Sequence, residues 1–480
     1  IFSSCTDDFE KLNTSNIQVN PADLPFAAQC TEPMTYCYPP QQNMFQFWTN
    51  LTIDLYGGYF MTPNGNFTNG DMGENRGHSG GMYENYYLHI FNNTRRIIAQ
   101  CDASGERGLS GVMRIVQAYG TLMTTDAYGP IPYSSILSGE NEVYFEFDSQ
   151  KDLYKAMLED LSTAITDISA MGADEIAKLK SFDCWCNGDK DLWVKIANTM
   201  KLRMALRLSK RETEAGNAGM NLKAIATEAA QNTLATVNKD ILIDKSLENE
   251  MWLMFNWGDC GFNANLVTIM SGTKDPRQPL YMTLNTGDIK NEAGTTTVAA
   301  NSQYLGIRFA SGLPAKPNSW GNFSGWIQGN NGSSYSMPLP IMKAAEAYFL
   351  LAEAKLRWDI GSESVKNLYE NGIRVSMTNE LAYRGAYAGI KEYPEGAVDA
   401  YINGTSTQID YTDPIKAELS TPAVNKLSVK WDESASNEEK LERIITQKWL
   451  ALFPLSTEGW AEQPAIHASS LHSSMKVMEP

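Results

Sequence analysis

Apolar side chains recur at helical spacing between Gly111 and Ser134, in the clearest pattern of the chain. The positions i, i+3, i+4, i+7, i+10 and i+11 are Val112, Ile115, Val116, Tyr119, Leu122 and Met123. This spacing places them on one face of a helix, and small residues at Gly111, Ala118 and Gly120 let a second helix approach closely. The helix must stop before Gly129-Pro130, because proline lacks an N–H and disfavours helical geometry in the preceding residue. The segment is therefore predicted to be scaffold.

Further segments predict more helices of the same kind. Helical stripes lie within residues 153–168, 193–208, 341–352 and 441–452, and helices are expected from about Gln41 to Tyr59 and from about Met82 to Cys101. The helix that ends near Cys101 directly precedes the one that contains Gly111. These two should pack as an antiparallel helix pair.

Two regions lack such a period. Residues 61–81 are dense in Gly and Asn, and residues 240–338 are rich in Gly, Asn, Thr and Trp. Such composition is typical of loops. The pattern predicts a mostly α protein: a tetratricopeptide-like scaffold of helix pairs with one large irregular insertion at about 240–338, although no strict sequence repeat is present.

The charge and hydropathy of the chain argue against two classes of function or location. The 480 residues carry a net charge of −17, so phosphate backbones would be repelled and nucleic-acid binding is not expected. No apolar run approaches the ~20 residues that span a bilayer.

Cysteines and histidines do not suggest a zinc centre. Seven cysteines stand at 5, 30, 37, 101, 184, 186 and 260, and there are four histidines, without a Cys-x-x-Cys pair. Cys184 and Cys186 are too close in sequence for an unstrained disulfide. The sequence leaves open whether Cys30 and Cys37 pair or stay free buried thiols, and likewise the state of Cys101 and Cys260.

Several motifs resemble the SusD-like (SusD/RagB) outer-membrane lipoproteins of gut Bacteroidetes. The first runs from Thr125 to Ser134, TDAYGPIPYS. The others, in chain order, are Trp193–Arg203, Asp275-Pro276-Arg277, Glu346–Ala354 with Trp358, Tyr369–Met377 and Ile444–Trp449. The resemblance implies a non-catalytic protein at the cell surface that captures oligosaccharides or polysaccharides. It also implies a partner, a SusC-like TonB-dependent transporter, over which the protein closes as a lid.

The N-terminal residues resemble the end of a bacterial lipoprotein signal. Small residues precede Cys5, which would receive the lipid, and Asp7-Asp8 resemble a surface-export signal. The acyl chains would hold the protein at the outer membrane. We therefore expect residues 1–15 to be an anchor remnant and tether, and residues 16–463 to be one SusD-like domain.

The C-terminal residues 464–480 depart from the family pattern. After Gly459-Trp460-Ala461-Glu462 the family usually continues Arg-Arg-x-Gly-Tyr-Pro, whereas this chain continues Gln463-Pro464-Ala465-Ile466-His467. Removing two bases from a coding sequence for this stretch permits Gly-Tyr-Pro-Arg. Our hypothesis is that the tail is frame-shifted, so that His467 and His472 carry no function.

Aromatic and amide residues in the irregular regions are the candidate ligand contacts, because flat rings stack on sugar C–H faces and amides bond hydroxyls. Trp320 and Trp326, flanked by glycines, are the first choices. The other candidates are Asn322, Tyr335, Trp252, Trp257, Phe67, Asn66 and Arg76. The alternative is that these aromatics only pin long loops to the scaffold.

The sequence supports catalysis or a bound cofactor less well than it supports ligand capture. There is no Gly-x-Ser-x-Gly elbow, and a glycosidase would need two facing carboxylates, which a sequence does not reveal. No cofactor is expected, although Asn69–Glu74 has oxygen ligands suited to Ca²⁺. Two alternatives to glycan capture therefore remain: a RagB-type peptide-binding lipoprotein and a glycoside hydrolase.

Overall fold

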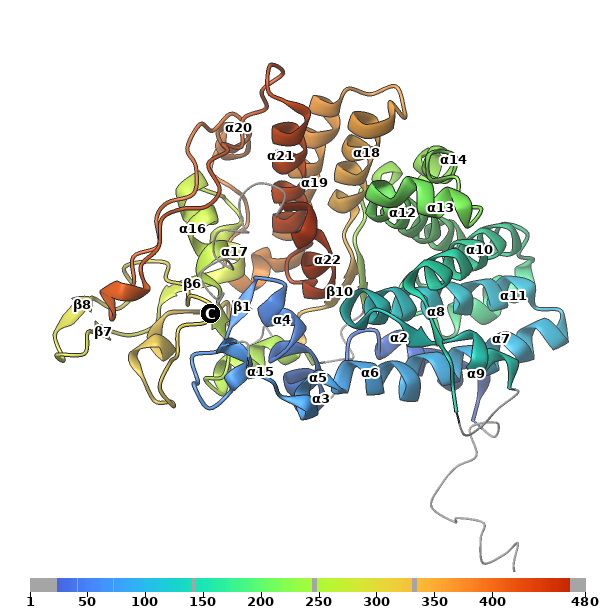
Figure 1. The fold of residues 1–480 in the computed structure, drawn as a ribbon, viewed down its shortest axis with the longest axis horizontal. Coiled ribbons are helices and arrows are strands. Elements are labelled where there is room, and N and C mark those ends of the chain that lie inside the picture. The colour runs from blue at the N-terminus through green and yellow to red at the C-terminus, as the bar shows by residue number, and fades with distance from the viewer. Residues whose placement is uncertain are drawn as a thin grey trace, which may run out of the picture.

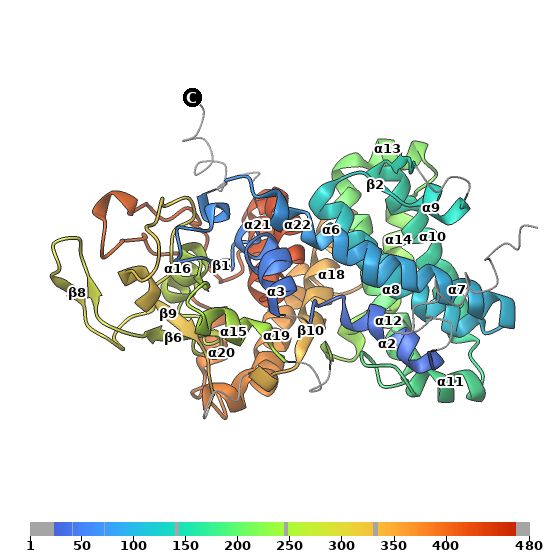
Figure 2. The same ribbon diagram turned by 90° about the horizontal axis from the view of Figure 1, so that it is seen from below.

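Paired helices form one side of the molecule, and short strands with long loops form the other (Figure 1). The computed structural model describes residues 24–40, 42–71, 73–139, 144–243, 248–329 and 335–466. The C-terminal helices lie between the two sides. The view from below places α3 and α6 between them as well (Figure 2). The prediction of a mostly α protein is confirmed.

The helices before the insertion are α2 Phe26–Thr35, α3 Gln42–Phe45, α4 Ile53–Tyr56, α5 Arg76–Ser79, α6 Gly81–Asn85, α7 Asn92–Ser104, α8 Arg107–Tyr128, α9 Ser134–Ser138, α10 Gln150–Ser169, α11 Ala173–Lys180, α12 Lys190–Arg207, α13 Glu212–Asn217 and α14 Leu222–Ala229. The later ones are α15 Glu250–Asn256, α16 Ala264–Thr273, α17 Gln278–Tyr281, α18 Ala344–Trp358, α19 Val365–Ala388, α20 Ala397–Ile402, α21 Asn437–Leu452 and α22 Ser456–Ile466.

Helix α8 is the centre of the helical half and confirms the strongest sequence pattern. It packs against α7 on one side and α10 on the other, so the predicted antiparallel pair with α7 is present. A methyl group at Gly111 would meet the Ala164 backbone at 3.2 Å, and one at Gly120 would meet Ile90 at 2.8 Å. These small residues therefore set how closely α8 approaches its neighbours. Gly129, with φ of 77°, ends the helix at the expected place.

Two predicted helices are interrupted. The segment expected to be helical from Gln41 to Tyr59 consists of α3, a π-helical stretch η2 at Gln46–Asn50, and α4. The segment expected from Met82 to Cys101 contains a second π-helical stretch, η4, at Tyr86–Phe91. A π-type hydrogen bond spans five residues instead of four, so it changes the direction in which the following side chains point.

Most of the short antiparallel strand pairs lie in the loop half, with α15, α16, α17 and α20, whereas one pair lies beside α9 in the helical half (Figures 1 and 2). The strands are β1 Phe60–Met61, β2 Ile131–Pro132, β3 Phe147–Asp148, β4 Ile241–Ile243, β5 Gly261–Phe262, β6 Met282–Asn285, β7 Ile289–Lys290, β8 Thr296–Val298, β9 Ser324–Trp326 and β10 Leu339–Met342. The pairs are β1–β5, β2–β3, β4–β10, β6–β9 and β7–β8. The β1–β5 pair joins the N-terminal segment to the insertion, so these distant segments share one core.

All six described cysteines are free thiols, so Cys30 and Cys37 are not paired with each other. Burial raises the pKa of the Cys37 thiol well above its usual value, which keeps it protonated and inert. No helix in the described ranges is long and apolar enough to cross a membrane. Cys5, His467 and His472 lie outside the described residues.

Candidate functional site

A buried carboxylate, Asp259, connects the two irregular regions that the sequence predicts separately. Asp259 is 6% exposed and follows α15 in the insertion. It accepts hydrogen bonds from Gln46 Nε2 at 3.0 Å, Asn64 Nδ2 at 3.0 Å and Lys316 Nζ at 2.6 Å. Three segments distant in sequence therefore meet at one side chain.

Backbone hydrogen bonds continue this connection along the loops. Gly65 N donates to Pro314 O at 3.0 Å, and Gly312 N donates to Asp71 Oδ1 at 2.8 Å. A Cβ at Gly65 would lie 1.7 Å from Leu313 O, so only glycine permits this approach. The 61–81 loop and the insertion therefore form one continuous, fixed surface.

Aromatic rings lie on both sides of η2 on this surface. On the α15 side, the Trp252 and Tyr335 ring centroids are 6.1 Å apart at 57°. On the α5 side, His78 stacks on Phe47 with centroids 4.7 Å apart, and Phe67 lies 6.1 Å from the same imidazole. Both α15 and α5 contact η2, so η2 connects the elements that carry the two groups.

We call this surface the loop face and define it by Phe47, Phe67, His78, Trp252, Trp257 and Tyr335. Tyr335 is 47% exposed, and the other five side chains are half-buried. Lys316 Nζ donates to the Trp257 carbonyl at 2.8 Å, which brings Trp257 next to the Asp259 connection. Trp252 Nε1 is buried and has no hydrogen-bond partner among the described residues. The loop face thus offers partly exposed aromatic rings, with the exposed Tyr335 ring beside Trp252.

His78 is neutral on this surface near pH 7. Desolvation lowers the pKa of its imidazole. Its Nδ1 lies 3.1 Å from Asn69 Oδ1, an acceptor, which favours the tautomer with the proton on Nδ1. The ring is therefore an uncharged stacking partner whose Nε2 can accept a hydrogen bond.

Two carboxyl groups have the raised pKa that a general acid needs. Burial raises the pKa of Asp54 to about 7, and burial with repulsion from Glu248 raises that of Glu250 to about 7. Asp54 is 2% exposed and Glu250 is 1% exposed. Both are packed inside the protein, where a glycosidic bond between them would have no access. Their raised pKa values are effects of burial.

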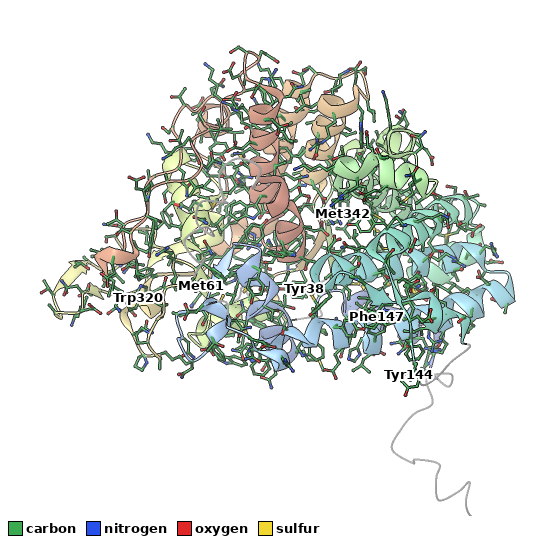
Figure 3. All side chains as sticks on the ribbon, viewed as in Figure 1. Tyr38, Met61, Tyr144, Phe147, Trp320 and Met342 are labelled. Atoms are coloured by element: carbon green, nitrogen blue, oxygen red, sulfur yellow. The ribbon has the colours of Figure 1, made fainter. Side chains whose placement is uncertain are left out.

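The structure corrects the two first choices for sugar contacts. Trp326 is 1% exposed, and the Arg384 guanidinium lies 5.1 Å from its ring centroid. Trp320 is 4% exposed and donates Nε1 to Asp413 Oδ2 at 3.1 Å. Figure 3 shows Trp320 among the side chains near β7 and β8. Neither ring has a face open to a sugar, so both pin loops to the core.

The remaining predicted contacts lie at the surface in different surroundings. Asn66 and Asn322 are exposed, and Asn322 Nδ2 donates to Asp288 O at 3.1 Å, away from the Asp259 connection. The Arg76 side chain is 89% exposed and pairs with Glu74 at 2.7 Å. Of the predicted residues, the structure brings together Trp252 with Tyr335, and Asn66, Phe67 and Trp257 around the Asp259 connection.

The oxygen-rich loop Asn69–Glu74 uses some of its oxygens within the fold. Asn69 Oδ1 faces His78, and Asp71 Oδ1 accepts from Gly312 N. Across the described residues no group of three His, Cys, Asp or Glu side chains that could hold a metal ion is found. Met72, in the middle of this loop, lies outside the described residues. Calcium binding stays a prediction.

Sequence reasoning missed the residues that assemble the loop face. Asp259 stands alone between Gly258 and Cys260, and Phe47 was predicted to belong to an ordinary helix. Lys316 stands among prolines in a loop. No periodic signal distinguishes these positions, because their partners are far away in sequence.

Comparisons with known proteins agree on one family. The family model described as "SusD-like: Susd and RagB outer membrane lipoprotein" matches residues 10–464. No curated protein matched. Among solved structures, a chitin-binding SusD homologue from Flavobacterium johnsoniae is similar with a TM-score of 0.77 and 26% identity, over 91% of this chain and 85% of that one.

Two Bacteroides structures are similar to the same degree. A SusD-like protein from Bacteroides thetaiotaomicron has a TM-score of 0.75 and 26% identity, over 91% of this chain and 85% of that one. A SusD homologue from Bacteroides ovatus has a TM-score of 0.75 and 27% identity, over 93% of this chain and 86% of that one. These matches confirm the tetratricopeptide-like helical fold that the motifs imply.

Proposed function

Because this chain belongs to the SusD-like family of outer-membrane lipoproteins, we propose that it captures oligosaccharides at the cell surface without cleaving them. It then delivers them to a partner TonB-dependent transporter. The similar Flavobacterium structure is described as chitin-binding, which supports a glycan as ligand.

The loop face is the observation that carries this proposal. Its rings are held by a fixed backbone, so little conformational entropy is lost when a ligand binds. Trp252 and Tyr335 offer ring surface, and the partly exposed Lys316 and the exposed Asn66 offer hydrogen bonds. Rings combined with a few polar groups are the usual means of recognising a sugar, whose ring has apolar C–H faces and an equator of hydroxyls.

Attachment and partner complete the proposed function. Cys5 carries the lipid, and the transporter is the partner to which the protein passes its ligand. A Cys5→Ala variant should no longer incorporate labelled palmitate in cells. Incorporation that persists in this variant would refute the anchor. If outer-membrane preparations yield the protein but no TonB-dependent transporter with it, the delivery step is wrong.

Affinity electrophoresis tests ligand capture. The protein is run through gels that contain glycans of different linkages, including soluble chitin derivatives. We expect one class to retard the wild type and the Trp252→Ala/Tyr335→Ala variant to migrate as in a glycan-free gel. The matched control is Tyr144→Ala. Tyr144 is 78% exposed and lies near the lower edge of Figure 3, far from Trp320 and the loops around it.

The same samples separate the alternatives. Release of reducing ends during incubation would mean a glycoside hydrolase and would end the capture proposal. Equal retardation of the wild type and the double variant would show that the loop face is not the binding site. The family description also names RagB, and the charge of −17 suits basic peptides, so a lysine-rich peptide is included as a competitor. Binding of that peptide in place of every glycan would favour the peptide function.

A further inference from the structure

Two adjoining hollows lie between the helical half and the C-terminal helices, and their lining residues are different from those that define the loop face. One has a volume of about 360 Å³ and the other about 270 Å³, and Ser209 and Arg357 line both. Ligand pockets are typically ~300–1,000 Å³. We call the two hollows together the waist groove, bounded by α12 with the short helix Leu208–Arg211 on one side and by α18, α21 and α22 on the other.

Each hollow is lined by one half-buried tryptophan. Trp460 of α22 lines the larger hollow, and Trp358 at the end of α18 lines the smaller. The edges of both indoles are fixed: Trp460 Nε1 donates to Asp126 O at 3.4 Å, and Trp358 Nε1 donates to Glu212 Oε1 at 2.6 Å. An indole held by its polar edge keeps its ring in a constant orientation, as a stacking platform requires.

Charges along the waist groove are paired with one another. Arg207 bonds Asp126 at 2.5 Å and also pairs with Glu458, and Lys448 lies 2.6 Å from Glu462. The groove therefore presents both positively and negatively charged groups to a ligand, without a large excess of either sign. That arrangement suits an uncharged polyol, whose hydroxyls both donate and accept.

Donors remain available on these paired groups. Arg357 donates Nε to Glu353 at 2.7 Å, and within the described ranges no hydrogen bond engages its two NH₂ groups. Arg357 lines both hollows, so these groups can donate to the hydroxyl oxygens of a ligand.

We propose that the waist groove is a second binding site for neutral oligosaccharides, with Trp460 and Trp358 as its two stacking platforms. The inference rests on the proposed function, because it assigns a second site to the same class of ligand. Neutral sugars fit better than anionic ones, since Arg207 and Lys448 already have carboxylate partners. A chain with two sites would hold a long glycan at two points, which increases its retention through effective concentration.

Isothermal titration calorimetry of the full chain tests the proposal. The titrant is a short neutral oligosaccharide of the class that retards the protein in gels. We expect two binding events per wild-type chain and one in Ser209→Phe, because Ser209 lines both hollows and a phenylalanine there would obstruct the groove where they adjoin. Trp358→Ala should weaken the groove event at least tenfold. Ser169→Phe, at an exposed position at the end of α10, is the matched control and should keep both events.

The outcomes separate the two sites. One event in the wild type that Ser209→Phe leaves unchanged and Trp252→Ala/Tyr335→Ala abolishes would overturn the waist groove and keep the loop face. No event with any glycan would overturn the proposed function itself. A lysine-rich peptide or a uronic-acid oligomer could give the groove event where the neutral sugar does not. That result would overturn the assignment of neutral oligosaccharides as the ligand of the groove. Thermal unfolding of each variant verifies that it is folded.

Discussion

The helical half and the loop half of this molecule bury different kinds of side chain to reach stable structures. In the helical half, α8 buries an apolar stripe against α7 and α10, and its backbone is satisfied within the helix. In the loop half, buried polar side chains satisfy the backbone instead. Asn285, 0% exposed, accepts from Ser302 N and Gln303 N and donates to two carbonyl groups.

This difference decides how each half responds to mutation. Apolar contacts in the helical half are many and individually modest, so stability is spread over them. In the loop half a single polar side chain holds several segments together. Its removal therefore releases all of these segments and leaves the rest of the fold in place. The waist, where α12 meets the C-terminal helices, combines both kinds, because its buried charges lie between packed helices.

The largest effect is expected at Arg203, in the waist. Its guanidinium bonds both oxygens of Glu346 at 2.6 Å and Glu458 at 3.0 Å, and all three groups are almost fully buried. Arg203→Ala leaves buried carboxylates without their partner, and the free energy of unfolding should fall by ~3–5 kcal/mol in denaturant titrations. Arg211→Ala, which removes an exposed pair with Glu214, is the control and should change it by less than ~0.5 kcal/mol. A loss below ~1 kcal/mol for Arg203→Ala would contradict this account of the waist.

The next effect is a pH dependence from Asp54, where α4 packs on α22. Burial raises the pKa of Asp54 to about 7 in the folded protein, above its usual value of 3.8. Between these two values the unfolded chain loses the proton first. The Asp54 contribution therefore lowers stability as pH rises from about 4 to about 7, by up to ~4 kcal/mol, and is constant above that.

Asp54→Asn should remove this slope. Unfolding free energies measured at pH 5 and at pH 7.5 give the comparison, and the wild type should lose more stability than the variant between them. Equal losses in the two proteins would show that Asp54 is not the titrating group.

Substitution of Asp259 should have a smaller effect on the stability of the whole protein and a large effect on the structure of the loop face. Asp259→Ala leaves Gln46, Asn64 and Lys316 without their acceptor. Lys316 is 41% exposed and can bond water, so the free energy of unfolding should fall by only ~1–3 kcal/mol. Glycan retardation should be lost nevertheless, and amide hydrogen exchange near Gly65 and Gly312 should accelerate. Unchanged exchange at these two amides would mean that Asp259 does not hold the loop face together.

The smallest effect is expected at Arg76, which lies on the 61–81 loop outside the polar connections. Its exposed pair with Glu74 should contribute less than ~0.5 kcal/mol to stability. Arg76→Ala therefore separates binding from folding: a loss of glycan retardation at unchanged melting temperature would make Arg76 a ligand contact, as its position in the sequence predicts. A drop in melting temperature of several degrees would contradict this assignment.

The two halves also differ in what a sequence reveals. The α8 pattern predicts its buried face, its small contact residues and its end at Gly129, because all three depend on neighbours within four residues. The π-helical stretches η2 and η4 are not predictable in this way, since they preserve the local helical composition. Trp326 shows the limit most clearly: its glycine neighbours indicate an exposed loop, but residues from four distant segments, among them Phe60 and Arg384, enclose its ring.

The Asp259 connection has a further consequence for the order in which the molecule folds. Its partners Gln46, Asn64 and Lys316 are 213, 195 and 57 residues away along the chain. Closing the two longer loops costs chain entropy before the hydrogen bonds return any free energy, whereas α7 and α8, which end at Ser104 and begin at Arg107, meet across a short connection. The α7–α8 pair can therefore form early, and the loop face is completed later.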